Sequence, residues 1–191
     1  SLVGSEMCIR DSPIDYVNNP IEIAKNDNMV SINSCIQVDL LGQVVSDTIG
    51  LSQFSAVGGQ VDFVRGATMS KGGRSIIAMP STARKCSVSR IVPLIAEGSA
   101  VTTPRNDVNY VVTEYGIAQL KGKTLKERAK ALIKISHPKF RPHLIVEYRK
   151  RFNEEPFTKE EFKEFTSIVK EKIKDKNESV IEKIKVKVSK L

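Results

Sequence analysis

Gly58 and Gly59 form the most suggestive part of the 191-residue sequence, because they come just before a predicted helix and stand beside Ser55 and Gln60. Paired glycines let a backbone approach a ligand closely, and the free N–H groups at a helix start can hold an anion or a polarised carbonyl. An ordinary tight turn has the same residues. The pair is not a dinucleotide-binding fingerprint, because the third glycine is missing.

A second candidate stretch, Met79-Pro80-Ser81-Thr82-Ala83-Arg84-Lys85, follows a predicted buried strand. Ligands in open α/β sheets bind beyond the carboxyl ends of the strands, so Arg84 or Lys85 there can pair with a phosphate. The alternative is that both residues are surface cations on a loop.

Glu114 is a third candidate, because it follows a predicted strand and precedes Gly116. A glutamate in that position can act as an acid, a base or a nucleophile. A lone glutamate is more often solvated or part of a helix cap.

Alternating strands and helices must position these stretches, which predicts an α/β fold. The apolar pattern predicts a helix at 20–28, strands within 30–45 joined by a turn at Leu41-Gly42, and a helix at 61–70. A buried strand at 75–82 and short β-rich runs at 89–95, 99–104 and 108–116 follow. Thr124 and Glu127 form a capping box that opens the next helix, with a buried stripe of Leu125, Ala129, Leu132 and Ile133. A last helix covers 138–152.

The composition is that of a globular chain, with 40% hydrophobic residues and a mean hydropathy of −0.20. No apolar run approaches the roughly 20 residues of a membrane span, so we expect no membrane partner. Cys8, Cys35 and Cys86 match no metal or disulfide pattern, which favours a reducing, cytoplasmic location. His137 and His143 have no acidic cluster beside them, and we expect no metal site.

The two ends of the chain differ from the rest. Residues 1–12 resemble translated sequencing-adapter read-through, and we expect the protein proper to begin near Pro13. Residues 153–191 form a Lys/Glu-rich tail with a second capping box at Thr158 and Glu161, which predicts a C-terminal helical segment. The net charge of +8 would suit a nucleic acid or a membrane surface, but the mixed signs of the tail favour a solvated helix instead.

Six blocks of sequence together carry a family resemblance. They are DYVNNPIEIAKNDNMVSINS, GQVVSDTIG, AVGGQVDFVRGA, SIIAMPSTA, SRIVPLI and VVTEYGIAQLKGKTLKERAKALIKISHPKFR, in this order. Together these blocks resemble the C-terminal domain of the acetyl-CoA hydrolase/transferase family, with the 4-hydroxybutyrate and butyryl-CoA:acetate CoA-transferases as the nearest branch. The resemblance covers about residues 13–141.

The resemblance implies a fold, a reaction and roles for particular residues. The fold is an open, mostly parallel sheet flanked by helices, a CoA-transferase-like domain of the NagB/RpiA type at 13–152. The reaction moves CoA between an acyl-CoA and a small carboxylate, through a glutamyl anhydride and a glutamyl-CoA thioester, with no permanently bound cofactor. Gly58 and Gly59 match the oxyanion-binding backbone, and Ser55 matches a CoA-contacting position. Arg84 replaces a CoA-contacting lysine, and Gln60 replaces a serine of some branches.

The resemblance also implies that the catalytic glutamate lies upstream of the DYVN segment. We therefore expect this chain to lack the nucleophile, to be inactive alone and to expose an apolar flank. Glu114 matches a segment of the family that is structural. The full-length parent is expected to be a homo-oligomer that binds no nucleic acid. The alternatives are an acetyl-CoA hydrolase of the same superfamily and a non-catalytic binding module.

Overall fold

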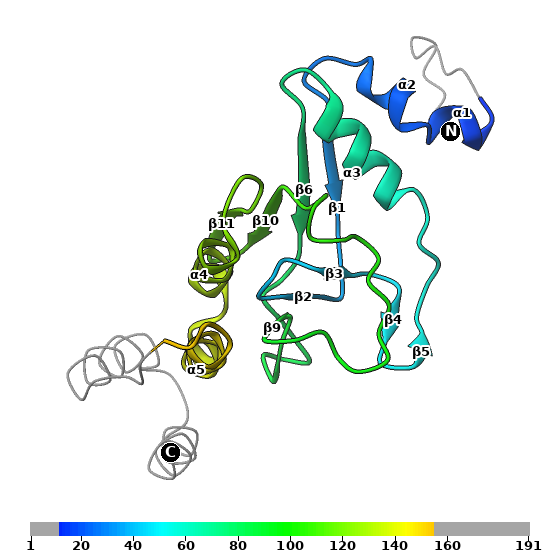
Figure 1. Ribbon diagram of the computed structural model, residues 1–191. Coiled ribbons are helices and arrows are strands. Elements are labelled where there is room, and N and C mark those ends of the chain that lie inside the picture. The colour runs from blue at the N-terminus through cyan, green and yellow to red at the C-terminus, as the bar shows by residue number, and fades with distance from the viewer. Residues whose placement is uncertain (1–11, 155–191) are drawn as a thin grey trace, which may run out of the picture.

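A four-stranded mixed sheet forms the centre of the computed structural model, which describes residues 12–154 (Figure 1). Its strand order is β1 (Val30–Asn33), β6 (Arg74–Ala78), β10 (Tyr110–Thr113) and β11 (Gly116–Gln119). β1, β6 and β10 run parallel, and β11 pairs antiparallel with β10 through a tight turn. The sheet is therefore open and mostly parallel, as the family resemblance implied.

Helices flank this sheet. α3 (Gln60–Met69) packs on β1 and β6, and α4 (Leu125–Ile135) packs on β10 and β11. α1 (Ile14–Val17) leads into α2 (Pro20–Ala24), which crosses α3 where Ile23 meets Gly66. A short 3-10 turn, η1 (Pro138–Phe140), opens α5 (Arg141–Phe152), which packs against α4.

Three smaller sheets form within the segments that connect the main strands and helices. β2 (Gln37–Asp39) pairs with β3 (Val44–Val45) and β9 (Ile91–Val92). β4 (Thr48–Ile49) pairs with β5 (Ser52–Gln53), and β7 (Thr82–Ala83) pairs with β8 (Val88–Ser89). The predicted turn at Leu41-Gly42 joins β2 to β3, and Gly42 adopts a φ of +86° there. The predicted β-rich run at 99–104 is wrong, because it makes only an isolated bridge between Val44 and Thr103.

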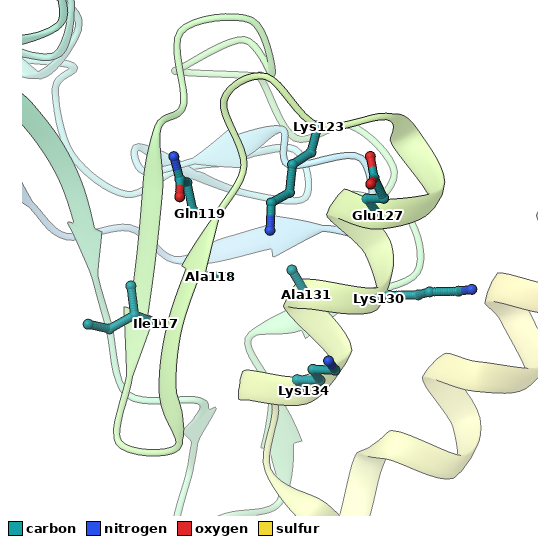
Figure 2. Close-up of a pocket in the computed structure, with 8 residues that line it drawn as sticks. All are labelled: Ile117, Ala118, Gln119, Lys123, Glu127, Lys130, Ala131 and Lys134. Atoms are coloured by element: carbon teal, nitrogen blue, oxygen red, sulfur yellow. The ribbon is translucent and has the colours of Figure 1, made fainter.

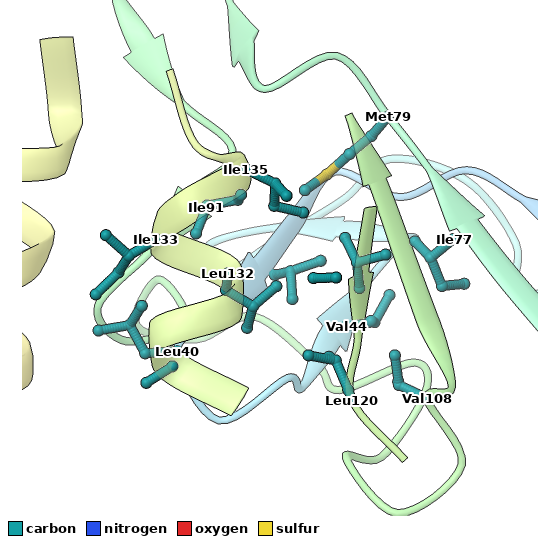
Figure 3. Close-up of a cluster of buried hydrophobic side chains, with 14 of the residues drawn as sticks. Leu40, Val44, Ile77, Met79, Ile91, Val108, Leu120, Leu132, Ile133 and Ile135 are labelled. Carbon is teal, nitrogen blue, oxygen red and sulfur yellow. The ribbon is translucent and has the colours of Figure 1, made fainter. Parts of the chain in front are cut away.

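The hydrophobic core lies between α4, the β2–β3–β9 sheet and one face of the main sheet (Figure 3). Leu132 of α4 is fully buried, and it shares this cluster with Val44 of β3 and Ile77 of β6. Since these residues come from three elements distant in sequence, the core fixes the small sheet against the large one.

The capping box of α4 is confirmed, because Thr124 accepts a hydrogen bond from the Glu127 N–H and Glu127 accepts one from the Thr124 N–H. One member of the predicted buried stripe is wrong: Leu125 is 39% exposed, whereas Arg128 is only 6% exposed. Arg128 is buried because its guanidinium donates to the backbone carbonyls of Leu41, Leu120 and Arg105 at 2.7–3.0 Å. An arginine that satisfies three loop carbonyls takes the position of an apolar residue.

The predicted helix at 61–70 is α3, one residue earlier at each end, and the predicted helix at 138–152 is confirmed as η1 followed by α5. The predicted helix at 20–28 is shorter, because α2 ends at Ala24. Residues 1–11 and the tail from 155, including the Thr158–Glu161 capping box, lie outside the described residues.

Candidate functional site

The glycine pair lies at the start of α3, as expected. Gly58 adopts a φ of +58°, and Gly59 is the residue that caps the helix. A side chain at Gly58 would meet no atom within 4 Å, so open space lies beside this backbone. The first N–H groups of a helix have no partner within it, and the helix dipole makes them attractive to negative charge. The turn therefore offers backbone donors to a ligand that can reach it.

Gly59 is constrained by a close neighbour rather than by its φ. A Cβ at this position would lie 2.7 Å from Asn18 Nδ2 and 3.2 Å from Phe63 Cδ2. Asn18 ends α1, so the helix pair at the start of the described chain closes one side of the glycine turn. Only glycine allows this approach without moving the amide.

Ser55 lies on an exposed loop that is fixed by Asp47, a residue the sequence had not singled out. The Asp47 carbonyl accepts the N–H groups of Phe54 and Ser55, at 2.7 and 3.1 Å. Its carboxylate accepts hydrogen bonds from Thr102 Oγ1 and Gln53 Nε2. The hydrogen bond from Thr102 is the main reason that the pKa of Asp47 lies below its ordinary value. The order Ser-Asp-Thr before Gly50 was the available signal, since aspartate commonly organises turns.

Gln60 lies inside the fold rather than on the open side of the turn. Its side chain is 8% exposed, and Nε2 donates to Thr103 Oγ1 at 3.0 Å. This bond ties the first turn of α3 to the segment that bridges β3. The amide donor is thereby engaged, and the side chain fixes the helix start on which the glycine turn depends.

Arg84 lies at the tip of the β7–β8 hairpin and is exposed. Arg84, Lys85 and Cys86 all adopt positive φ values, of 49°, 53° and 63°. Ser87 supports the tip, because both its N–H and its Oγ donate to the Arg84 carbonyl. Left-handed conformations cost energy in non-glycine residues, so this hairpin presents its cations from a constrained turn.

Glu114 is held by the loop that precedes this hairpin. It accepts a hydrogen bond from the Ser81 N–H at 2.8 Å and another from Ser81 Oγ at 2.5 Å. Burial raises its pKa, but the bonds from Ser81 and the charge of nearby His137 more than offset this, and the net pKa is lowered. With both carboxylate oxygens engaged, Glu114 serves to connect two strand ends, which agrees with the structural role expected for this segment.

The sequence candidates share one edge of the main sheet. α3 packs on β1 and β6 and is joined to the start of β6 by a short turn, so its own start lies toward the carboxyl ends of these strands (Figure 1). The 79–84 loop leaves β6 at that same edge, and Glu114 follows β10 there. The carboxyl edge of a parallel sheet is where α/β proteins bind ligands.

A separate groove lies between α4 and β11, the outermost strand of the sheet next to β10 (Figure 2). Its volume is about 380 Å³, and Lys123, Lys130 and Lys134 line it together with Gln119. Lys123 points into the groove, whereas Lys130 points away from it and its Nζ lies 5.6 Å from the centroid of the Tyr148 ring (Figure 2). Glu127 also lines the groove. It contains none of the candidates chosen from sequence.

Within residues 12–154, no three His, Cys, Asp or Glu side chains are grouped to hold a metal ion. None of the helices in that range has the length and apolar character needed to cross a bilayer.

Comparison with known proteins gives a consistent result. Residues 4–148 match the acetyl-CoA hydrolase/transferase C-terminal domain. The chain is 65% identical over 150 residues to 4-hydroxybutyrate coenzyme A transferase of Clostridium kluyveri, covering 78% of this chain and 35% of that protein. Among solved structures, RipA from Yersinia pestis is 53% identical with a TM-score of 0.68, covering 75% of this chain and 32% of RipA.

The 4-hydroxybutyrate CoA-transferase of Porphyromonas gingivalis is a second solved relative, 54% identical with a TM-score of 0.61. It matches over 73% of this chain and 31% of its own length. The chain thus spans about a third of the length of the relatives it matches.

Proposed function

The chain belongs to the acetyl-CoA hydrolase/transferase family as its C-terminal domain, and from this premise we propose that it is part of a CoA-transferase. The enzyme moves CoA between an acyl-CoA and a small carboxylic acid such as acetate, butyrate or 4-hydroxybutyrate. The observation that carries this proposal is the open Gly58–Gly59 turn at the start of α3, on the carboxyl edge of a parallel sheet.

The glycine turn contributes the oxyanion donors in this proposal. A carboxylate attacks the thioester carbonyl carbon, which becomes tetrahedral, and the carbonyl oxygen becomes an oxyanion. The C–S bond then breaks, and CoA leaves as the thiolate. The N–H groups at Gly58 and Gly59 stabilise this oxyanion, and the dipole of α3 adds to their effect. The turn suits this task because it is already formed and needs no rearrangement when charge develops.

The residues proposed to bind CoA are Ser55, Gly59, Gln60 and Arg84. Ser55 lies on the exposed loop before the turn, and Arg84 presents a guanidinium that can pair with a phosphate. Gln60 is buried, so in this proposal it contributes by holding the first turn of α3 through its hydrogen bond to Thr103. A guanidinium can bind a phosphate through two parallel N–H donors, whereas a lysine ammonium acts as a point charge. Arg84 should therefore bind the phosphate with a different geometry from a lysine.

The nucleophilic carboxylate is proposed to come from outside residues 12–154. Two acidic groups that support the candidate loops are engaged in hydrogen bonds, Glu114 with Ser81 and Asp47 with Thr102 and Gln53. The isolated chain is therefore expected to be inactive, and the amino-terminal residues 1–12 to contribute nothing to catalysis.

We also propose that the complete enzyme needs no resident cofactor, acts as a homo-oligomer and works in the cytoplasm on acyl-CoA and a free carboxylate. Anhydride and thioester exchange require only a carboxylate, donors and cations, which supports the first point. Cys35 and Cys86 are free thiols, which is the usual state in a reducing compartment.

Hydrolysis of the thioester is the second candidate, because the family to which the chain belongs groups hydrolases with transferases. Water then takes the place of the acceptor acid. The same glycine turn would stabilise the oxyanion in either reaction, so the structure of the turn does not separate them.

A chimera tests the proposal. Residues 13–152 of this chain replace the matching segment of the Clostridium kluyveri enzyme, to which the chain is 65% identical. We expect CoA to appear on butyrate or 4-hydroxybutyrate when acetyl-CoA is the donor, and no turnover with the isolated chain. Release of free CoA at the same rate with and without an acceptor acid would favour the hydrolase instead. A soluble chimera without either activity would contradict the proposed function.

A further inference from the structure

The two faces of the main sheet are covered very unequally. On one face, Ser75 and Ile77 of β6 and Val111 of β10 are at most 2% exposed. On the other face, Ile32 of β1 is 68% exposed and Ile117 of β11 is 70% exposed. Strand residues alternate between the two faces, and the register places the exposed apolar residues side by side. We call the apolar part of this surface the open face; it consists of Val30, Ile32, Ile76, Ala78, Val112 and Ile117. Arg74, Tyr110 and Gln119 lie on the same side of the sheet, toward the amino ends of its parallel strands.

Both helices that pack on the sheet lie on its covered face. Val64 of α3 and Leu132 of α4 belong to one buried cluster with Ile77 and Val111, whose side chains point to that face. The β2–β3–β9 sheet joins the same cluster through Val44. The described layers are therefore stacked on a single side of the sheet.

A one-sided arrangement is unusual for parallel strands. Parallel sheets occur almost only where both faces are covered, because the connections between parallel strands place helices on the faces. The cross-strand pairs Ile32–Ile76 and Val112–Ile117 make the open face apolar across all four strands. A contiguous apolar patch of this kind marks a surface that meets another part of a protein.

We infer that the open face is the docking surface for the amino-terminal part of the same enzyme, which supplies the missing layer over β1, β6, β10 and β11. The chain matches a C-terminal domain and spans about a third of its relatives, so about two thirds of each relative is available to form that layer. A layer joined through the chain is present at a high effective concentration, which favours it over a second copy of this domain. This inference rests on family membership and not on the proposed reaction.

Cysteine accessibility tests the inference without any assay of activity. Ile32→Cys is introduced into the isolated chain, which also carries Cys8→Ser and Cys86→Ser. The same substitution is introduced into the chimera described above, which lacks residue 8 and carries Cys86→Ser, and labelling is followed on the peptide that contains the introduced cysteine. Lys134→Cys is the matched control, because Lys134 is an exposed residue of α4 on the covered side of the sheet. A polar maleimide measures the labelling rate of each thiol, and buried Cys35 is expected to stay unlabelled.

The expected result is fast labelling at both positions in the isolated chain. In the chimera, labelling at position 32 should slow at least tenfold while labelling at 134 changes less than twofold. Equal labelling of position 32 in the two proteins would overturn the inference. A second copy of the chain could instead cover the face. Position 32 would then label slowly in the isolated chain, and sedimentation would show a dimer that Ile32→Asp converts to a monomer. This result would also overturn the inference. The more conservative Ile117→Thr, which keeps a β-branched side chain, should leave the isolated chain folded and reduce its binding of an apolar dye.

Discussion

Glu114 joins two strand ends by accepting both the N–H and the Oγ–H of Ser81, at 2.8 and 2.5 Å. Ser81 opens the loop that follows β6, and Glu114 follows β10, the neighbouring parallel strand. The pair therefore sets the position of the loop that leads to Arg84. A residue that looked like a candidate nucleophile in the sequence is a structural link in the fold.

Glu114→Gln should destabilise the protein by about 1 kcal/mol, because a neutral amide oxygen replaces an ionised acceptor that stays partly open to water. Urea denaturation of the isolated chain measures this. Glu147→Gln is the matched control, since Glu147 pairs with exposed Lys150 three residues later and should change stability by less than half as much. Equal effects of the two substitutions would contradict the linking role of Glu114.

The same pair predicts a pH dependence. The pKa of Glu114 lies below its ordinary value of 4.5 in the folded protein, so its contribution to stability is complete above that pH. It is lost as the pH falls from about 4.5 through the lower folded pKa. The difference in unfolding free energy between wild type and Glu114→Gln should therefore shrink as the pH is lowered below 4.5. A difference that grew under acid would show that the pKa is raised instead.

Gly42→Ala should cost far more stability than Gly122→Ala. Both glycines adopt a positive φ, of 86° and 78°, so the strain of a left-handed alanine is shared. A Cβ at Gly42 would collide with the Arg128 guanidinium and lie 2.9 Å from Leu120 Cδ1, whereas one at Gly122 meets no atom within 4 Å. We expect a loss of about 1 kcal/mol at Gly122 and about 3 kcal/mol or more at Gly42, as Arg128 is forced from its three carbonyls. Thermal unfolding of the two variants measures the gap.

Gly58→Ala tests the glycine turn in the chimera. Gly58 and Gly122 both have a positive φ and open space around the missing Cβ, so their alanine variants should lose similar stability. Only the substitution at Gly58 should lower kcat, by about tenfold or more, because it displaces the proposed oxyanion donors. Similar kcat values for the two variants would show that the turn does not act in catalysis.

Arg84→Gln should raise the KM for acyl-CoA about three- to tenfold and leave kcat nearly unchanged, since it removes one exposed charge-assisted contact to a phosphate. The effect should shrink at high salt, because an exposed ion pair is screened. Lys85→Gln, at the neighbouring exposed position, is the control and should change KM by less than twofold. An unchanged KM in Arg84→Gln would remove Arg84 from the proposed CoA site.

The sequence predicted several helices and turns of the fold well, because these depend on patterns of neighbouring residues. The α4 capping box, α3 and the β2–β3 turn follow from spacing and glycine positions that lie close together in the chain. Arg128 was missed because its three acceptors come from segments up to 87 positions away, and no local pattern records them. Asp47 had a local signal in the Ser-Asp-Thr order before Gly50, which marks a turn, but its bond with Thr102 forms only in the folded chain.

The sequence analysis expected an exposed apolar flank, but it did not locate that flank on one face of the main sheet. Alternation in β1 places Val30 and Ile32 on one side, and β10 carries a valine on each side, but the pattern does not say which side the helices cover. The structure identifies the covered side, because residues of α3 and α4 belong to one buried cluster with Ile77 and Val111.

Isotope exchange in the chimera tests the central proposal most directly. Radiolabelled acetate is incubated with unlabelled acetyl-CoA, and the label entering acetyl-CoA is measured over time. A CoA-transferase built on this domain should pass label into acetyl-CoA without a second acyl-CoA, because acetate can react with the enzyme-bound CoA thioester. Exchange that is present in the chimera, absent in the isolated chain and reduced about tenfold or more by Gly58→Ala is the predicted result. A soluble chimera that hydrolyses acetyl-CoA but never labels it, or that does neither, would contradict the account.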